Sequence, residues 1–535
     1  MRLLCFLALM LICLCTRQAL GKTGRSLMTD EQIRQARANA AKYDWAAKSL
    51  TDAKNAVDWV LRMSDEDLWN FVPPADQPRA LNVCFSVDCP VHGAEIFRKG
   101  GHYPWIIDRD HPFKVKCPIG GEVYPSNDFV PWSDSHAAKP DAGAQYFDDG
   151  SGWVAEDGKR YWFVAYYIFW QRWRGDILPV IPKLAYVYAL TGDARYSHKA
   201  AVMLARIASE YPKMDYRKQA YHNGSYPAPC TGKILDLDWE GSATIEPLAV
   251  AYDEIYDGLG DDTALAAFLA GKGIAHPKDF IEANFLQEAA KAIETGIVHG
   301  NMNFQEQLAV VARVLDNSDP SRGYTTDQMI DWIMNGPGEM NTLLYNGVTR
   351  DGAASEESIG YTSIWTNSFL GLGERLKPLG CDILSNPRLK KMVDFYVQTT
   401  VADRFSPCIG DAHGDMTGGA APVLNRYIFG KAYQIWGDPI YAKVLNRVGW
   451  PAPEIAEKPE ALEAAEAKAK SLGTDLDLKT RDLGGYGLAV LETGKGDSHR
   501  AATLYYGSEG AWHGHFDRLN ISMWSRGRCV LPEMG

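Results

Sequence analysis

The sequence predicts a mainly α-helical chain that ends in antiparallel β-structure. Two observations support this fold class. Between about residues 160 and 435, apolar residues recur at helical spacing, and short turns rather than strand patterns separate the helices. After residue 479, short β-branched and aromatic runs alternate with Gly, Asp and Ser. We therefore expect stacked antiparallel helical hairpins, as in a solenoid or toroid, followed by strands.

The first 21 residues are typical of an export signal. Arg2 precedes a short apolar run, and small residues from Ala19 to Gly21 provide a cleavage site, so the mature chain is expected to begin near Lys22. An uncleaved membrane anchor is the alternative, but the run is short for a bilayer. We expect a secreted or periplasmic protein with no membrane segment in its mature form.

Helical periodicity begins again after the signal and runs from about residue 30 to 70. Residues 72–160 then form a loop-rich insertion, which favours a functional role. In the next helical pair, Gly192 is expected to end the first helix and Asp193 to cap the second. The predicted domains are a helical domain over 22–435 that includes the insertion, a linker over 436–478, and the N-terminal part of a β-domain over 479–535. Because a few strands cannot close a sandwich, the β-domain is expected to be truncated.

Composition and motifs exclude several function classes. The formal net charge of -12 argues against a general polyanion-binding surface, so no nucleic-acid partner is expected. No glycine-rich phosphate-binding motif has supporting context, so no nucleotide cofactor is expected.

A cluster of cysteines in the insertion has metal-ligand spacing. Cys89 and His92 lie three residues apart, and Cys84 and Cys117 would complete a tetrahedral structural Zn²⁺ site. The alternative is one disulfide and a buried thiol, because an oxidising compartment favours disulfides. Without Cys5, Cys13 and Cys15 of the signal, the ten cysteines become seven, so at least one is unpaired.

Five segments, taken in order, resemble the heparinase II/III-like polysaccharide lyases. These include heparin, heparan and alginate lyases, and dermatan sulfate epimerase shares their architecture. The segments span roughly residues 40 to 535 and read "AYVYALTGDARYSHKAAVMLARIASEYP", "WEGSATIEPLAVAYDEIYDGL", "GNMNFQEQLAVVARVL", "TRDGAASEESIGYTSIW" and "WHGHFDRLNISMWSRGRCVLPEMG". The resemblance implies an incomplete (α/α) toroid followed by the start of an antiparallel β-sandwich, with a sugar cleft between them.

The resemblance implies β-elimination on an acidic polysaccharide. A base removes the C5 proton beside a uronate carboxylate, and the substrate's added negative charge must be neutralised. Asn301 matches the amide that holds the carboxylate, although a helix N-cap is the alternative. Met302 departs from the histidine of several members, and a thioether cannot carry protons. Tyr361 matches the catalytic tyrosine, against the alternative of a core tyrosine, and Glu356 is placed at the substrate or its loop.

The stretch "WHGHFD" places His513, His515 and Asp517 at every second position. On an extended strand these side chains would share one face. The resemblance assigns His513 to proton transfer or carboxylate contact and His515 to a metal, usually zinc. Glu533 stands where the family has a further ligand, so this metal site is incomplete within the chain.

Two further groups are candidates for the cleft. His413 in "IGDAHGD" is a second proton carrier, although the two Asp residues there also suit a turn. The segment 159–176 interleaves aromatic and basic residues that suit sugar rings and acidic groups. Packing in the helical core explains most of its aromatics equally well. The candidate substrate-binding residues of this segment are Trp162, Tyr166, Trp170, Arg172 and Arg174.

The sequence thus predicts an exported polysaccharide lyase, with Tyr361 and His513 as acid and base in an order left open. A uronate C5-epimerase or a catalytically inactive glycan-binding protein on the same scaffold are the alternatives. A glycoside hydrolase would need two carboxylates across the cleft, for which Glu306 and Glu356 are the available pair.

Overall fold

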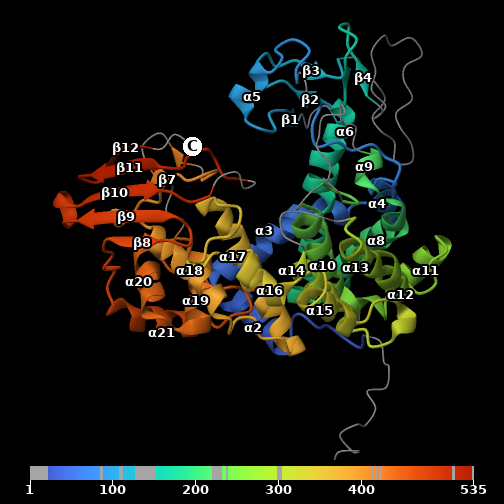
Figure 1. Cartoon of the computed structure of the whole chain (residues 1–535). Coiled ribbons are helices and arrows are strands. Elements are labelled where there is room, and N and C mark those ends of the chain that lie inside the picture. The colour runs from blue at the N-terminus through green and yellow to red at the C-terminus, as the bar shows by residue number, and fades with distance from the viewer. Residues whose placement is uncertain are drawn as a thin grey trace, which may run out of the picture. The chain divides into compact units, whose positions relative to one another are not determined.

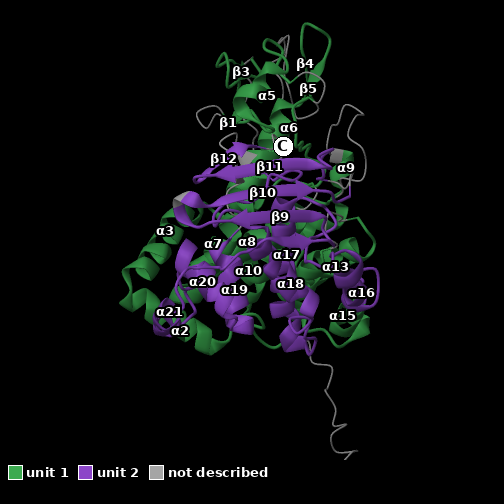
Figure 2. Ribbon diagram, turned by 60° about the vertical axis from the view of Figure 1, so that its left-hand side comes forward, with its two compact units in different colours: residues 1–331 green, residues 332–535 purple. Residues whose placement is uncertain are grey.

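The computed structural model describes most of the chain beyond the predicted signal. The described residues are 22–84, 88–107, 112–126, 152–219, 232–236, 239–297, 304–412, 414–415, 419–420, 424–508 and 513–532. They form two compact units, residues 1–331 and 332–535 (Figure 2), and each unit is described by itself. None of the described helices combines the length and the apolar character that crossing a bilayer requires.

Unit 1 is built from helical hairpins. Its α-helices are α2 (Asp30–Lys42), α3 (Asp44–Leu61), α4 (Asp65–Phe71), α5 (Glu95–Gly100), α6 (Phe163–Tyr167), α7 (Val180–Thr191), α8 (Ala194–Glu210), α9 (Tyr216–Gln219), α10 (Glu246–Ile255), α11 (Thr263–Gly271), α12 (Pro277–Ile281), α13 (Gln287–Glu294) and α14 (Gln305–Leu315), and α15 (Thr326–Met334) crosses into unit 2. Three π-helical segments interrupt them: η1 (Ile168–Ile177), η3 (Glu240–Ile245) and η5 (Glu282–Leu286).

The turn between α7 and α8 matches the sequence prediction. Gly192 adopts a left-handed conformation (φ 72°) at the end of α7, where residues other than glycine are strained. Asp193 caps α8 by accepting a hydrogen bond from the Arg195 backbone N–H. The inward faces of the two helices are rich in Ala, Leu and Val, which allows them to pack closely.

The described residues of the predicted insertion 72–160 contain little regular secondary structure. Apart from α5, its described elements are two-residue strands: β1 (Ile106–Ile107), β2 (Val115–Lys116), β3 (Val123–Tyr124), β4 (Trp153–Val154) and β5 (Arg160–Tyr161). Strands β1, β2 and β3 form one antiparallel sheet, and Figure 1 shows α5 close to them. The ring of Tyr124 stacks on Phe163 at 4.7 Å, which fastens this sheet to the start of α6.

Unit 2 combines helices with a five-stranded antiparallel sheet (Figure 1). Its helices are α16 (Met340–Asn346), α17 (Ile359–Leu376), α18 (Pro387–Thr399), α19 (Arg426–Trp436), α20 (Pro439–Val448) and α21 (Pro459–Lys470). A two-stranded ribbon joins β6 (Gly414–Asp415) and β7 (Gly419–Ala420). The main sheet has the order β12-β11-β10-β9-β8, with bounds β8 (Arg481–Leu483), β9 (Leu488–Thr493), β10 (Arg500–Tyr505), β11 (Asn520–Ser525) and β12 (Arg528–Leu531).

One face of the main sheet packs on the helices of the same unit. Tyr486, in the turn before β9, meets Phe395 of α18 at 5.0 Å, and Trp524 of β11 stacks on Phe405. The other face exposes large apolar side chains, so both faces are apolar, as in the strands of a sandwich. The exposed side chains of that face are Leu491, Leu504, Ile521, Met523 and Leu531.

The predicted fold class, helical hairpins followed by antiparallel β-structure, is confirmed. Residues 436–478, predicted as a linker, contain the helices α20 and α21. The compact units divide within the helical region, at residues 331 and 332.

Candidate active site

The N-terminus of α17 positions Tyr361. Ser358 is fully buried and caps the helix, and its hydroxyl accepts a hydrogen bond from the Tyr361 backbone N–H at 3.4 Å. Trp365 follows one turn later, so its side chain lies on the same side of α17 as Tyr361. The indole N–H of Trp365 donates to Glu356 Oε1 at 2.6 Å, which ties the segment before the helix to its first turns.

His513 and His515 lie on the connection between β10 and β11, not on a strand as the sequence predicted. The connection is held by residues distant in sequence. Asp411 N–H donates to the His513 carbonyl oxygen at 2.9 Å, and Gly410 N–H donates to Asp517 Oδ2 at 2.9 Å. These bonds replace the ladder that a neighbouring strand would supply. The side chains of His513, His515 and Asp517 still all contact the segment 356–411, as the alternation predicted.

Tyr361 and His513 lie in direct contact. Their ring centroids are 3.4 Å apart and their planes differ by 10°, so the two rings are stacked. Both residues belong to unit 2. Tyr361 is partly buried, and the His513 side chain is 12% exposed. The structure therefore brings together the two residues on which the predicted acid–base chemistry depends.

Glu356 orients the imidazole of His513. Its carboxylate oxygen Oε2 lies 2.5 Å from His513 Nδ1, and the residue is buried. A carboxylate accepts but does not donate, so Nδ1 carries the proton in this contact. Nε2 is then left with its lone pair in the neutral ring. Among the described residues Nε2 has no hydrogen-bond partner. Glu356 thus contacts the side chain for which the sequence predicted proton transfer, and its own predicted place at the substrate or its loop stays a prediction.

His515 pairs with a carboxylate. Its Nε2 lies 2.7 Å from Asp411 Oδ1, and both side chains are partly exposed. Within the described part of the chain, His515 joins no group of three or more metal-ligand side chains. The predicted partner Glu533 lies outside the described residues, as do Asn301 and His413.

A cavity of about 560 Å³ in unit 2 adjoins these residues along the chain. Glu357, next to Glu356, and Arg518, next to Asp517, both line it. Tyr486 donates its phenol to the Glu357 carbonyl oxygen at 2.6 Å. Burial raises the pKa of that phenol well above its ordinary value, helped by Tyr505 and by the charges of Asp517 and Glu357. Tyr486 therefore stays protonated and acts as a fixed donor in the cavity wall.

The aromatic and basic residues of 159–176 lie on β5, α6 and η1 of unit 1. Trp162 and Tyr166 are buried, which favours the packing alternative for these two. Arg172 lies over the ring of Phe71 at 3.9 Å, and Arg174 lies between Trp170 and Trp239 at 4.8 and 4.3 Å. Both guanidinium groups thus stack on aromatic faces of their own unit.

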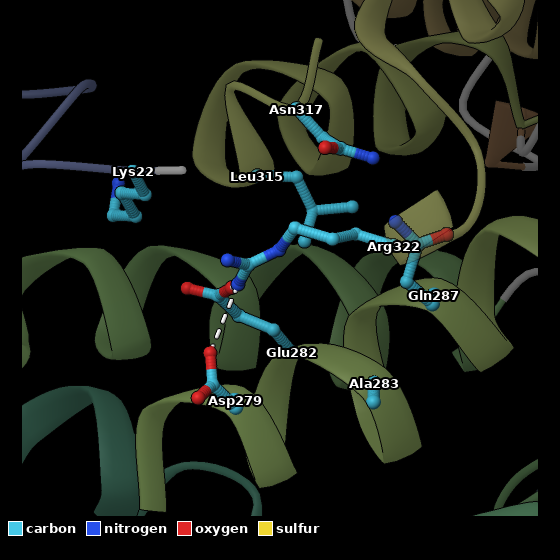
Figure 3. A pocket seen from close by; sticks show the side chains of 8 residues that line it. All are labelled: Lys22, Asp279, Glu282, Ala283, Gln287, Leu315, Asn317 and Arg322. Atoms are coloured by element: carbon cyan, nitrogen blue, oxygen red, sulfur yellow. Dashed lines mark hydrogen bonds and ion pairs between the residues drawn. The ribbon is translucent and has the colours of Figure 1, made fainter. Parts of the chain in front are cut away.

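Unit 1 contains a separate cavity of about 330 Å³ (Figure 3). Arg322 crosses it and makes ion pairs with Asp279 at 2.9 Å and Glu282 at 3.0 Å. Lys22 of its lining pairs with Asp253 outside the lining, and none of the predicted site residues lines this cavity. The lining residues are Lys22, Asp279, Glu282, Ala283, Gln287, Leu315, Asn317 and Arg322.

The structure gathers three of the four predicted zinc ligands. Cys89, His92 and Cys117 place one ligand atom each within 4.8 Å of one another. Cys84 is buried but lies outside this group, so the structure does not place it as the fourth ligand. Among the residues that the structure describes, none of the three cysteines forms a disulfide.

Sequence reasoning missed the partners Trp365 and Asp411. The four-residue spacing from Tyr361 was a usable signal for Trp365, because residues at that spacing share a helix face. No local signal identified Asp411, since it is 104 residues from His515 in the chain.

Comparisons with known proteins identify solved structures of lyases. No family model matches the chain, and no curated protein matches it. The chain is similar to a heparinase III (16% identity, TM-score 0.41, 71% of this chain and 54% of that one). It is also similar to the heparan sulfate lyase HepC from Pedobacter heparinus (16%, 0.43, 96% and 64%). An alginate lyase from Bacteroides ovatus matches as well (14%, 0.44, 83% and 99%). The chain spans about half the length of the heparinase III chain.

Proposed function

We propose that the chain is an exported polysaccharide lyase that cleaves a uronate-containing glycan by β-elimination. The observation that carries this proposal is the stacked pair of Tyr361 and His513, with Glu356 fixing the imidazole. A phenol and an oriented imidazole in contact provide a proton donor and a proton acceptor within reach of one sugar residue.

The reaction needs one proton removed and one delivered. Nε2 of His513 takes the proton from C5, the C5–H electrons form the C4–C5 double bond, and the C4–O bond breaks. The hydroxyl of Tyr361 protonates the departing glycosidic oxygen. A free phenol has a pKa near ~10, so it is a suitable acid and a poor base at neutral pH. Glu356 offsets the positive charge that His513 gains.

The cavity lined by Glu357 and Arg518 has one cationic group for an acidic polysaccharide. Arg518 offers a guanidinium to a substrate carboxylate or sulfate. We retain Asn301 as the proposed amide for the carboxylate at the reacting sugar. Neutralising that carboxylate is the main electrostatic requirement of the reaction, because proton loss at C5 adds negative charge to the same group.

The test uses the full-length chain and two measurements: formation of an unsaturated product and exchange of the C5 proton. Heparan sulfate and alginate, the glycans named for similar structures, are the first substrates. A lyase releases an unsaturated uronate that absorbs in the near ultraviolet. Tyr361→Phe should lower its formation at least about 100-fold, because the leaving oxygen loses its acid. Tyr427→Phe, at an exposed position on α19, should leave the rate unchanged and is the matched control.

Exchange of the C5 proton with deuterated solvent separates the roles and the alternatives. Tyr361→Phe should retain exchange, whereas His513→Asn should lose both exchange and absorbance. If Tyr361→Phe forms the absorbing product at the wild-type rate, the assignment of Tyr361 as the acid is refuted. Exchange in the wild-type chain without any absorbance would instead identify an epimerase. Glycan binding without exchange or absorbance would identify a non-catalytic binding protein.

A further inference from the structure

The loop-rich insertion of unit 1 brings two short chain turns face to face. Cys89 and His92 belong to the turn before α5, where Gly93 N–H donates to the Cys89 carbonyl oxygen. Cys117 and Glu122 close the hairpin between β2 and β3, where Cys117 N–H donates to the Glu122 carbonyl oxygen at 2.8 Å. Each turn thus presents two polar side chains toward the other.

The distances among these side chains fit a tetrahedral metal. The two sulfurs are 3.8 Å apart, and His92 Nδ1 lies 3.6 Å from Cys89 Sγ and 3.5 Å from Cys117 Sγ. Ligands at zinc's usual bond lengths on a tetrahedron lie about 3.8 Å apart for two sulfurs and about 3.5 Å apart for sulfur and nitrogen. A disulfide would need about 2.05 Å between the sulfurs.

Glu122 is a candidate for the fourth ligand position. Its Oε2 lies 3.6 Å from His92 Nδ1. This oxygen is buried and has no hydrogen-bond partner. A buried carboxylate oxygen without a partner is costly, and a cation is the partner that would compensate it. The sequence had assigned this position to Cys84. The group whose ligand atoms all lie within 4.8 Å of one another holds neither Cys84 nor Glu122, so the fourth ligand has to move toward the ion when it binds.

We propose that Cys89, His92, Cys117 and Glu122 bind one structural Zn²⁺ ion. Two sulfurs and an imidazole nitrogen select zinc over Ca²⁺ or Mg²⁺, which take oxygen ligands. The ion replaces the hydrophobic core that two-residue strands cannot build. It also fixes the β2–β3 hairpin, which reaches α6 through the stacking of Tyr124 on Phe163.

Metal content and Co²⁺ spectra of the full-length chain test the site. The purified protein should contain one zinc per chain. After chelation, titration with Co²⁺ should give the intense visible bands of a tetrahedral site and near-ultraviolet bands from bound thiolate, saturating at one equivalent. Thiol titration of the metal-free chain should find Cys89 and Cys117 reactive only after chelation.

Three variants assign the ligands. Cys117→Ser should abolish the thiolate bands, and Glu122→Gln should weaken metal binding at least about 10-fold. Cys84→Ser, at a buried cysteine outside the group, should retain one equivalent and is the matched control. Circular dichroism of each variant checks that the helices remain folded. A wild-type chain that binds no Co²⁺ would overturn the site. Retention in Glu122→Gln together with loss in Cys84→Ser would overturn the role of Glu122.

Discussion

At the scale of single residues, the contact between Glu356 and His513 decides which nitrogen of the imidazole is available. The carboxylate at Nδ1 fixes the tautomer whose Nε2 carries a lone pair, and the Trp365 indole holds the other carboxylate oxygen. Glu356 therefore determines both the orientation and the protonation pattern of its neighbour without touching the sugar in the proposed reaction. It is a positioning residue.

Glu356→Gln should separate this positioning role from a packing role. The amide oxygen can still accept from Trp365, but its NH₂ group would face Nδ1 and favour the tautomer with the proton on Nε2. We expect kcat to fall about 100-fold or more with little change in KM, because the base is lost while the fold is kept.

The tautomer itself is the decisive readout for this variant. Nitrogen chemical shifts of ¹⁵N-labelled histidine should move the proton of His513 from Nδ1 to Nε2. The control is Glu374→Gln, at a residue on α17 like Tyr361. It removes an ion pair with Lys431 of α19 and should change neither kcat nor the nitrogen shifts. An unchanged tautomer with reduced kcat would contradict the positioning role.

The sequence predicted Tyr361 and His513 as the proton-transferring residues, because each stands in a recognisable motif. It did not identify what holds them. Glu356 and His513 are 157 residues apart, and contacts over such separations leave no periodic signal in one sequence. Side-chain roles were therefore predictable only where a motif carried them.

At the scale of elements, the segment around Gly410 holds the connection that bears His513. Gly410 has φ 60°, and a Cβ there would overlap the His513 carbonyl oxygen. Its N–H also donates to Asp517. Gly410 therefore contacts the connection between β10 and β11 at two residues, His513 and Asp517. The alternating pattern of "WHGHFD" predicted a strand because it shows which side chains share a direction. It does not show whether the backbone partners are a strand or an irregular segment such as 410–411.

Gly410→Ala should destabilise unit 2 and displace His513. The left-handed conformation alone costs about 1–2 kcal/mol for alanine, and the overlap with the carbonyl should add about 1–3 kcal/mol. Gly380→Ala is the matched control, because Gly380 has φ 88° but open space around its Cβ position. Urea unfolding should show a larger loss of unfolding free energy for Gly410→Ala. Equal losses in the two variants would mean that the close approach to His513 has no energetic weight.

At the scale of the whole molecule, local periodicity predicted the helical hairpins and the strands, because those patterns repeat within a few residues. The division into compact units depends on longer contacts. Phe395 and Phe405 meet Tyr486 and Trp524, so the sheet packs on helices that precede it in the chain, across the predicted linker. No stretch of sequence by itself encodes that packing.

The stability of unit 1 should depend on pH through Glu254 of α10. Burial, and next the charge of Asp253, raise the pKa of Glu254 from 4.5 to about 8, so the folded chain keeps a proton that the unfolded chain releases. The contribution of this group to stability is therefore complete below about pH 4.5 and is lost as the pH rises through about 8. Between these limits one proton gives a slope of at most about 1.4 kcal/mol per pH unit.

Glu254→Gln, which mimics the protonated acid, should flatten the fall in unfolding free energy measured by urea titration between pH 5 and 8. Glu31→Gln on the exposed surface of α2 should leave the wild-type slope, and a wild-type slope in Glu254→Gln would show that this carboxyl does not hold the proton.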